Sequence, residues 1–255
     1  MDYGCLRVES SDRLAVVAMA RPPVNAVNQD MYREIWHLFR RSRQFTNTSA
    51  VILTGEGRHF CAGNDLHEFR TMTGENAAER MFHVREAFWS IYDCEVPVIA
   101  AVHGSAVGTG LALAASCDLI VASNEARFGL PELSVGVMGG AKHLSRLVPQ
   151  GVVREMFLTA ETMGADEMAA WGGIARVVPS NELMATATTL ASAIARHSPL
   201  AIRVAKRALN AIEYRDLKSG YQLEQDLTGV MADTSDGKEA LAALLEARVP
   251  VYDGT

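Results

Sequence analysis

The chain has 255 residues, of which 49% are hydrophobic, and it carries a formal net charge of −6. This length and composition predict a globular protein with a large core, either one domain or a domain with a helical appendage. The acidic balance and the lack of a Lys/Arg patch exclude broad attraction to phosphate backbones, so we expect no nucleic acid partner.

Strand-like runs rich in Val and Ile alternate with helical patterns in the first two thirds of the chain. Strands are expected at residues 14–19, 50–54, 98–102 and 119–122, and helices at residues 29–45 and 77–92. In the two helical patterns, apolar residues recur every three or four positions. This repetition of strand and helix predicts an α/β fold.

The pattern changes after about Val178, where helices are expected without strands between them. These helical patterns cover residues 181–196, 199–210 and 221–231. They predict an all-helical extension, whose apolar faces must pack on its own core or on a neighbouring subunit.

Residues 96–117 contain no Asp, Glu, Lys or Arg and are long enough for a membrane span. Pro97 and three glycines divide the segment, which favours a strand, a turn and a helix over a span. Residues 1–7 lack the basic start and apolar run of a secretory signal. We therefore expect a cytoplasmic protein that does not bind a membrane.

The four cysteines, Cys5, Cys61, Cys94 and Cys117, are far apart in the sequence. They form no CxxC pair, and no histidine stands at metal-ligand spacing from them. We expect reduced thiols and no metal site.

Two glycine-containing stretches carry the chemical signal. Residues 59–66 (HFCAGNDL) follow the expected strand 50–54, and residues 104–111 (GSAVGTGL) follow the strand 98–102. A helix is expected to begin around Gly108, which places Thr109 in its first turn, where N–H groups have no intrahelical partner. Such turns also occur for packing alone. Two converging N–H donors, however, can stabilise the negative charge that develops on a thioester oxygen.

Other short motifs accompany these stretches. They are residues 21–26 (RPPVNA), 117–118 (CD), 126–129 (ARFG), 131–133 (PEL) with Gly136, and 247–252 (ARVPVY). Together they resemble the enoyl-CoA hydratase/isomerase, or crotonase, superfamily over essentially the whole chain. The resemblance implies a crotonase-like spiral of ββα units in residues 1–195 with the acyl-CoA site. It also implies a C-terminal helical region, 196–255, that mediates homotrimers, often stacked into homohexamers.

The same resemblance implies an acyl-CoA thioester as substrate, with coenzyme A as part of the substrate and no further cofactor. By residue-to-residue matching, the oxyanion donors are the N–H groups of Asn64 and Thr109. Thr109 replaces the more usual glycine or alanine, which leaves the backbone donor in place and narrows the pocket. Substrate and coenzyme A contacts are expected at Ala26, Ala62, Asp65, Leu66, Gly108 and Ala112. The Asp65 carboxylate is expected mainly to cap the following helix.

One of two family glutamates is missing. In family hydratases a glutamate lies one helical turn after the second donor, and that position is Ala112, which faces the donor's side of the helix without titrating. The other position is Glu132, whose apolar neighbours are expected to raise its pKa, and we predict that it is the general base. The alternative is an exposed loop carboxylate.

A further position that carries an acid in some family isomerases is Gly140. Lys142 and His143 follow it, and the alternatives for them are an exposed helix start or an influence on substrate choice. A single base favours moving a proton along an enoyl-CoA, an isomerase-type reaction. Enoyl-CoA hydratase, a hydrolase or carbon–carbon lyase of CoA thioesters, and a non-catalytic acyl-CoA-binding protein are the alternatives.

Overall fold

The computed structural model describes residues 3–40, 45 and 47–255. A six-stranded sheet forms the centre of the fold, with its strands in the order β1-β2-β3-β4-β6-β9. These strands are β1 (Leu6–Ser11), β2 (Leu14–Met19), β3 (Ala50–Gly55), β4 (Val98–Val102), β6 (Leu119–Ser123) and β9 (Arg176–Val178). β1 and β2 form an antiparallel hairpin, and the other neighbours are parallel.

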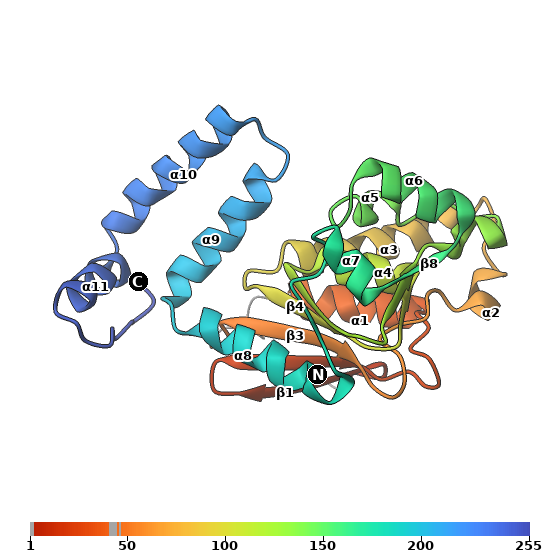
Figure 1. Ribbon diagram of the computed structural model, residues 1–255, viewed down its shortest axis with the longest axis horizontal. Helices are drawn as coiled ribbons and strands as arrows, with labels where there is room; N and C mark the ends of the chain where they lie inside the picture. Colours follow the sequence, from red (N-terminus) through yellow and green to blue (C-terminus); the bar gives the residue numbers. More distant parts are fainter. Residues whose placement is uncertain (1–2, 41–44, 46) are drawn as a thin grey trace.

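Strand β3 is buried along its whole length because the sheet is covered on both faces. Val51 and Leu53 belong to the main core cluster, whereas Ala50 and Ile52 belong to a second cluster on the opposite face. Helix α8 (Leu183–Ala195) covers the second face, and α1 (Gln29–Arg40), α3 (Ala77–Tyr92) and α4 (Thr109–Ser116) lie on the first (Figure 1). The α/β prediction is confirmed.

A smaller three-stranded sheet has the order β5-β7-β8. Its strands are β5 (Ser105–Val107), β7 (Arg127–Gly129) and β8 (Thr162–Gly164). Short helices surround it: α2 (Leu66–Phe69), the 3₁₀-helix η2 (Pro131–Val135), α5 (Ala141–Leu144), α6 (Gln150–Thr159) and α7 (Ala165–Ala170). The β5 strand leads directly into α4, so this sheet positions the second glycine-containing turn.

The predicted strands match the structure closely. Of the helix expected over 29–45, the structure describes Gln29–Arg40 as α1, and residues 41–44 lie outside the described residues. Residues 96–117 form β4 and α4, as expected from Pro97 and the glycines, with the short strand β5 where only a turn was expected. No helix among the described residues is long and apolar enough to cross a membrane. All four cysteines are free thiols.

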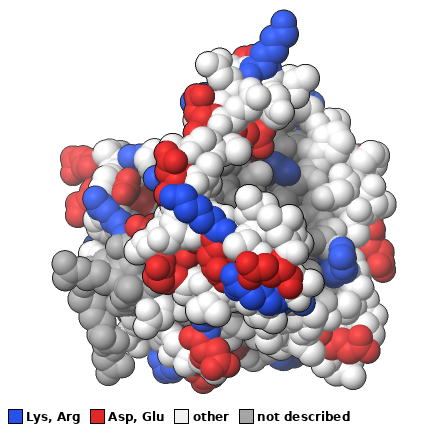
Figure 2. Space-filling view, turned by 90° about the vertical axis from the view of Figure 1, so that its left-hand side faces the viewer, with Lys and Arg blue, Asp and Glu red and all other residues white. Residues whose placement is uncertain are grey.

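The C-terminal part is helical, as predicted. After the short 3₁₀-helix η3 (Ser180–Glu182), the chain forms α8, α9 (Pro199–Ile212), α10 (Leu217–Ala232) and α11 (Ser235–Leu245). Figure 1 shows α9, α10 and α11 beside the layered core rather than on it. The face that carries these helices has Lys/Arg and Asp/Glu interspersed, with no large patch of one sign (Figure 2).

Candidate active site

The loop that carries Asn64 is held against the segment around Val27. Val27 N–H donates to the Gly63 carbonyl (2.8 Å), and Asp65 N–H donates to the Val27 carbonyl (2.9 Å). In such a parallel bridge, the residue between the two bonded ones directs its own N–H to the opposite side. Asn64 N–H therefore faces away from Val27, and no acceptor for it lies in the described part of the chain.

Thr109 is the first residue of α4, with Gly108 as its N-cap. The first helical bond in this turn is from Ala112 N–H to the Gly108 carbonyl (3.1 Å), so the Thr109 N–H has no intrahelical partner. A β-carbon on Gly110 would collide with the Cys61 carbonyl. Only glycine at this position lets α4 begin so close to the loop that carries Asn64.

Glu132 is presented by the 3₁₀-helix η2, which begins with Pro131 and ends at Gly136 in the left-handed conformation (φ 73°). Its side-chain Oε2 is buried and has no hydrogen-bond partner among the described residues. Burial raises the pKa of the Glu132 carboxyl, because the charged form loses its hydration and gains no cation in exchange. Glu132 is thus half-buried rather than an exposed loop carboxylate, and its role as general base stays a prediction.

The three predicted catalytic residues line one cavity of about 170 Å³. The complete lining is Ala62, Gly63, Asn64, Leu66, Phe69, Gly108, Thr109, Pro131, Glu132, Ser134, Val135 and Val137. Glu132 is the only ionisable side chain in this lining, and the other side chains are mostly apolar. Such an arrangement can place one carboxylate and two N–H donors around a small ligand that is mostly apolar.

Some of the predicted coenzyme A contacts line the Glu132 cavity, and others do not. Ala62, Leu66 and Gly108 line the cavity, whereas Ala26 and Asp65 do not. Ala112 is 2% exposed, lies in the main core cluster and is likewise not part of the lining. The contact roles of these residues stay predictions.

The predicted capping role of Asp65 is confirmed. Its Oδ1 accepts from the N–H groups of His67 (2.9 Å) and Glu68 (3.2 Å) at the start of α2. Its Oδ2 pairs with Arg21, whose other nitrogen donates to the Ala26 carbonyl (2.8 Å). These bonds lower the pKa of the Asp65 carboxyl, with the Glu68 N–H as the main cause. They attach α2 to the turn that contains Ala26.

Tyr32, which was not predicted as a site residue, contacts both donor residues. Tyr32 is 1% exposed, and its hydroxyl lies 2.7 Å from Asn64 Oδ1 and 2.8 Å from Thr109 Oγ1. The detectable signal was a tyrosine next to Met31 on the apolar face of α1, since a buried tyrosine hydroxyl needs a hydrogen-bond partner.

Lys142 and His143 differ in their exposure to solvent. Lys142 is exposed and lies over the ring of Tyr214, as an exposed helix start predicts. His143 is half-buried, with its ring edge-on to Phe88 at a centroid distance of 4.8 Å. Burial, with a smaller effect of Arg146, lowers the pKa of His143 to about 4. The expectation of an exposed His143 was wrong.

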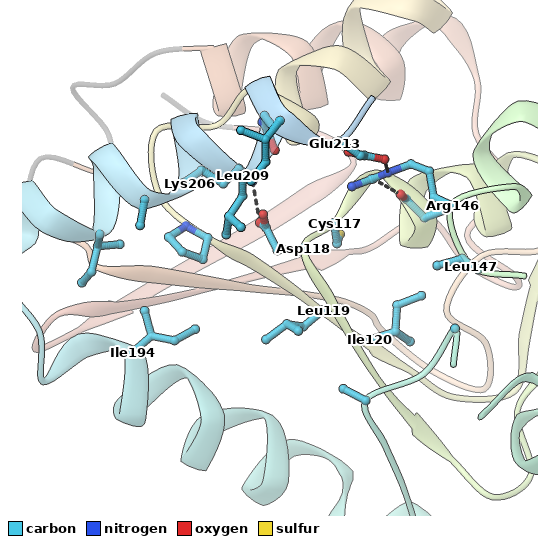
Figure 3. Close-up of a pocket in the computed structure, with 18 of the residues that line it drawn as sticks. Cys117, Asp118, Leu119, Ile120, Arg146, Leu147, Ile194, Lys206, Leu209 and Glu213 are labelled. Carbon is cyan, nitrogen blue, oxygen red and sulfur yellow. Dashed lines mark hydrogen bonds and ion pairs between the residues drawn. The ribbon is translucent and has the colours of Figure 1, made fainter. Parts of the chain in front are cut away.

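A larger cavity, of about 850 Å³, lies between α9 and the core, away from Glu132 (Figure 3). Its charged groups are already paired. Lys206 Nζ contacts Asp118 Oδ2 (2.5 Å), and Arg146 Nε contacts Glu213 Oε1 (2.8 Å). Size alone would favour this cavity, but its Lys and Arg side chains already pair with carboxylates and none of Asn64, Thr109 and Glu132 lines it, so the smaller cavity around Glu132 is the candidate active site.

Comparison with known proteins agrees with this geometry. A family model described as enoyl-CoA hydratase/isomerase matches residues 9–255. A short-chain-enoyl-CoA hydratase of Clostridium acetobutylicum is 35% identical over 253 residues, covering 97% of each chain. A (7aS)-7a-methyl-1,5-dioxo-2,3,5,6,7,7a-hexahydro-1H-indene-carboxyl-CoA hydrolase of Rhodococcus jostii is 38% identical over 226 residues, covering 88% of each chain.

Solved structures give the same result. The crystal structure of enoyl-CoA hydratase from Bacillus anthracis superimposes with a TM-score of 0.93 at 31% identity, covering 98% of this chain and 100% of that one. The structure of Pseudomonas aeruginosa DspI has a TM-score of 0.94 at 31% identity, covering 98% and 97%. The chain has the crotonase fold; it belongs to the enoyl-CoA hydratase/isomerase family and is an enzyme that acts on coenzyme A thioesters.

Proposed function

We propose that this enzyme moves a proton between carbons of an enoyl-CoA, with Glu132 as the single general base. The observation that carries the proposal is the cavity lining, in which Glu132 is the only ionisable side chain and lies with Asn64 and Thr109. One base is sufficient for this reaction, because the same carboxyl group can take a proton and return it.

The reaction proceeds in two balanced steps. The Glu132 carboxylate takes a proton from C2 of a 3-enoyl-CoA, and the electron pair of that C–H bond moves onto the thioester oxygen to form a dienolate. The N–H groups of Asn64 and Thr109 stabilise this negative oxygen. The protonated Glu132 then returns its proton to C4, and the product is a 2-enoyl-CoA. No separate cofactor takes part.

The cavity favours an uncharged acyl group. Leu66, Phe69, Val135 and Val137 supply apolar side chains, and no Lys, Arg or His occurs in the lining. A carboxylate on the acyl chain would be buried there without a cation to pair with, next to Glu132. The coenzyme A part is proposed to extend along Ala62 and Leu66 toward Ala26 and Asp65.

Hydration of a 2-enoyl-CoA is the second candidate, because relatives carry that name. Besides the Clostridium acetobutylicum enzyme, a 2,3-dehydroadipyl-CoA hydratase of Escherichia coli is 35% identical over 254 residues. Hydration needs a positioned water and usually a second acid. Ala112 occupies the predicted position of that acid and is buried in the core, which supports the isomerase reaction instead.

The test is ultraviolet absorbance of the conjugated thioester, measured after adding the enzyme separately to 3-enoyl-CoA and 2-enoyl-CoA. A rise with the 3-enoyl compound supports the proposal, and a loss with the 2-enoyl compound alone replaces it by hydration. Release of free thiol from either compound would instead indicate a hydrolase. Binding without any conversion over several chain lengths would favour a non-catalytic acyl-CoA-binding protein.

We also propose that residues 196–255 form a separate C-terminal helical region that assembles the cytoplasmic enzyme into a homotrimer, or two stacked trimers. Large apolar side chains stay exposed on this region in the single chain. They are Leu209, Tyr214, Leu217, Tyr221, Val230, Leu241, Leu244, Leu245, Val249 and Val251. So many exposed apolar groups on one region indicate a surface that a partner covers.

A further inference from the structure

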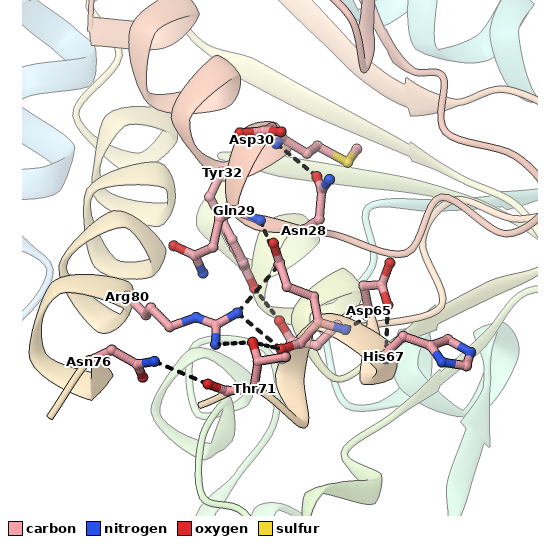
Figure 4. A network of polar contacts seen from close by, with 12 residues as sticks. Asn28, Gln29, Asp30, Tyr32, Asp65, His67, Thr71, Asn76 and Arg80 are labelled. Atoms are coloured by element: carbon pink, nitrogen blue, oxygen red, sulfur yellow. Dashed lines mark hydrogen bonds and ion pairs between the residues drawn. The ribbon is translucent and has the colours of Figure 1, made fainter. Parts of the chain in front are cut away.

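Tyr32 connects the two residues whose N–H groups are proposed to bind the thioester oxygen. It reaches from α1 toward the loop that precedes α2 (Figure 4). Asn64 lies on that loop, whereas Thr109 begins α4 in a different part of the sequence. The Tyr32 hydroxyl is within hydrogen-bond distance of both side chains, at 2.7 and 2.8 Å. A single atom therefore contacts both halves of the proposed donor pair.

Only one arrangement of donors and acceptors fits these two contacts. The Tyr32 hydroxyl donates its proton to Asn64 Oδ1. Thr109 must then donate to the Tyr32 oxygen, since a phenol has only one proton to give. Each of the three polar groups is satisfied, and burial keeps the tyrosine neutral by raising its pKa. Any displacement of Asn64 relative to Thr109 breaks one of the two bonds.

The rest of Tyr32 is rigidly held. Its ring is edge-on to Phe88 of α3, with a centroid distance of 6.1 Å and an interplanar angle of 88°. Met31 and Ile35 beside it on α1 are fully buried. The hydroxyl is thus fixed by the packing of α1 on α3, and it transmits that fixed position to the two loops.

Backbone donors need no polar side chains, and buried polar groups without partners are costly. Thr109 is 5% exposed, yet its side chain carries a hydroxyl. That hydroxyl lies within hydrogen-bond distance of the Tyr32 oxygen, which accepts its proton. We propose that Tyr32 is a positioning residue, which fixes the separation of the Asn64 and Thr109 N–H groups through their side chains. The inference rests on the proposed function of these two groups.

The experiment uses a chromophoric probe, 4-(dimethylamino)cinnamoyl-CoA, whose absorbance shifts to longer wavelength when hydrogen bonds draw electrons onto its carbonyl oxygen. Tyr32→Phe removes only the hydroxyl. Its bound probe is expected to lose a large part of the red shift that the wild type produces. In turnover, kcat is expected to fall about 10- to 100-fold, less than the loss of a whole oxyanion donor, with KM changing less than about threefold.

Tyr92→Phe is the matched control. The Tyr92 hydroxyl also donates a hydrogen bond, with Glu213 Oε2 (2.8 Å) and the Asn210 carbonyl (3.2 Å) both within reach, but it does not line the Glu132 cavity. This variant is expected to keep the red shift and kcat. A purely structural effect of losing a hydrogen-bonded tyrosine hydroxyl would appear as lower thermal stability without loss of the red shift.

Variants of Thr109 test the same contact without changing Tyr32. Thr109→Val keeps the N–H group and the side-chain shape but loses the hydroxyl, so it should lose part of the red shift, and no more than Tyr32→Phe, which also removes the bond to Asn64. Thr109→Ser keeps the hydroxyl and should restore most of the red shift. The double variant Tyr32→Phe/Thr109→Val should be no worse than Tyr32→Phe alone, because Tyr32→Phe already removes the contact with Thr109.

Two failures are distinguishable. A wild type that binds the probe without a red shift overturns the proposed oxyanion donors, and the role of Tyr32 with them. A wild-type red shift that persists at full size in Tyr32→Phe and Thr109→Val overturns the role of Tyr32 alone.

Discussion

The Glu132 carboxylate lies directly against Gly108: a β-carbon built on Gly108 would come within 3.1 Å of Glu132 Oε1. Gly108 also has a φ of 55°, which side-chain-bearing residues rarely adopt. Gly108 thus leaves room for the Glu132 carboxylate, the proposed base, and is the N-cap of the helix that carries Thr109. This close approach joins the two halves of the candidate site.

Gly108→Ala is therefore expected to reduce kcat/KM by at least about tenfold and to destabilise the fold by about 1–3 kcal/mol, because alanine is strained at this φ and its methyl group would displace Glu132. Steady-state kinetics and urea unfolding measure the two effects. The control is Gly151→Ala in α6, where a β-carbon meets nothing within 4 Å. This control should stabilise the helix by about 0.5–1 kcal/mol. Normal activity in Gly108→Ala would contradict the close packing of Glu132.

Glu132→Gln is expected to lower kcat by about 100- to 10,000-fold, the usual contribution of a positioned base. Binding of the acyl-CoA, measured by calorimetry, should persist because the cavity keeps its shape. Glu155→Gln is the control, since Glu155 is exposed on α6. If Glu132→Gln retained full activity on the true substrate, Glu132 would not be the base.

The same variant should not lose stability at neutral pH. The folded-state pKa of Glu132 is raised by burial, so its ionisation costs the folded state free energy. This cost appears as the pH rises through the unfolded-state value toward the folded-state value, and it is absent at lower pH. Glu132→Gln should accordingly have a Tm equal to or above that of the wild type at pH 7. A clearly lower Tm would indicate that the carboxylate has a stabilising partner.

The pH profile of kcat/KM should have an acidic limb that belongs to Glu132. A base must be ionised, so activity falls as the pH drops through its pKa, which lies above the ordinary value of 4.5. His143 adds no limb near neutrality, because its pKa is lowered to about 4. The residual activity of Glu132→Gln should lack the limb, and a limb that persists in it would assign the titration to another group.

Much of the fold was predictable because its signals are local. The Val/Ile-rich runs at 14–19 and 98–102 coincide with β2 and β4, and Pro97 with the glycines correctly divided residues 96–117. The three-residue strands β5, β7 and β8 were not predicted. A strand of three residues has too few alternating positions to show a period, and tertiary pairing defines it.

The candidate site was predictable where a backbone turn or a motif carries it. Asn64, Thr109 and Glu132 were named from the sequence, and the structure brings all three to one cavity. Tyr32 was not, because its position on α1 reads as part of an apolar stripe and its partners are 32 and 77 residues away. The burial of His143 was missed for the same reason, since Phe88 of α3 provides it.

The contact between Lys206 and Asp118 is expected to fix α9 to the core. Lys206 is 3% exposed, and Asp118 Oδ2 also accepts from Val98 N–H (2.7 Å) at the start of β4. Asp118→Ala leaves a buried ammonium group without its partner and should cost about 3–5 kcal/mol in urea unfolding. Arg33→Ala breaks the exposed pair with Asp30 and should cost less than about 1 kcal/mol. Equal costs would show that the Lys206 pair is effectively solvated.

Assembly should depend on the exposed apolar side chains of α11. Leu244 and Leu245 are 77% and 78% exposed in the single chain, at the end of the helical region. Their joint replacement, Leu244→Glu/Leu245→Glu, places charges on the proposed interface, and we expect light scattering after gel filtration to show a monomer in place of a trimer. Leu158→Glu is the control, because Leu158 is 67% exposed but lies on α6 of the core. A wild-type monomer, or a double variant of unchanged mass, would show that these leucines do not hold subunits together.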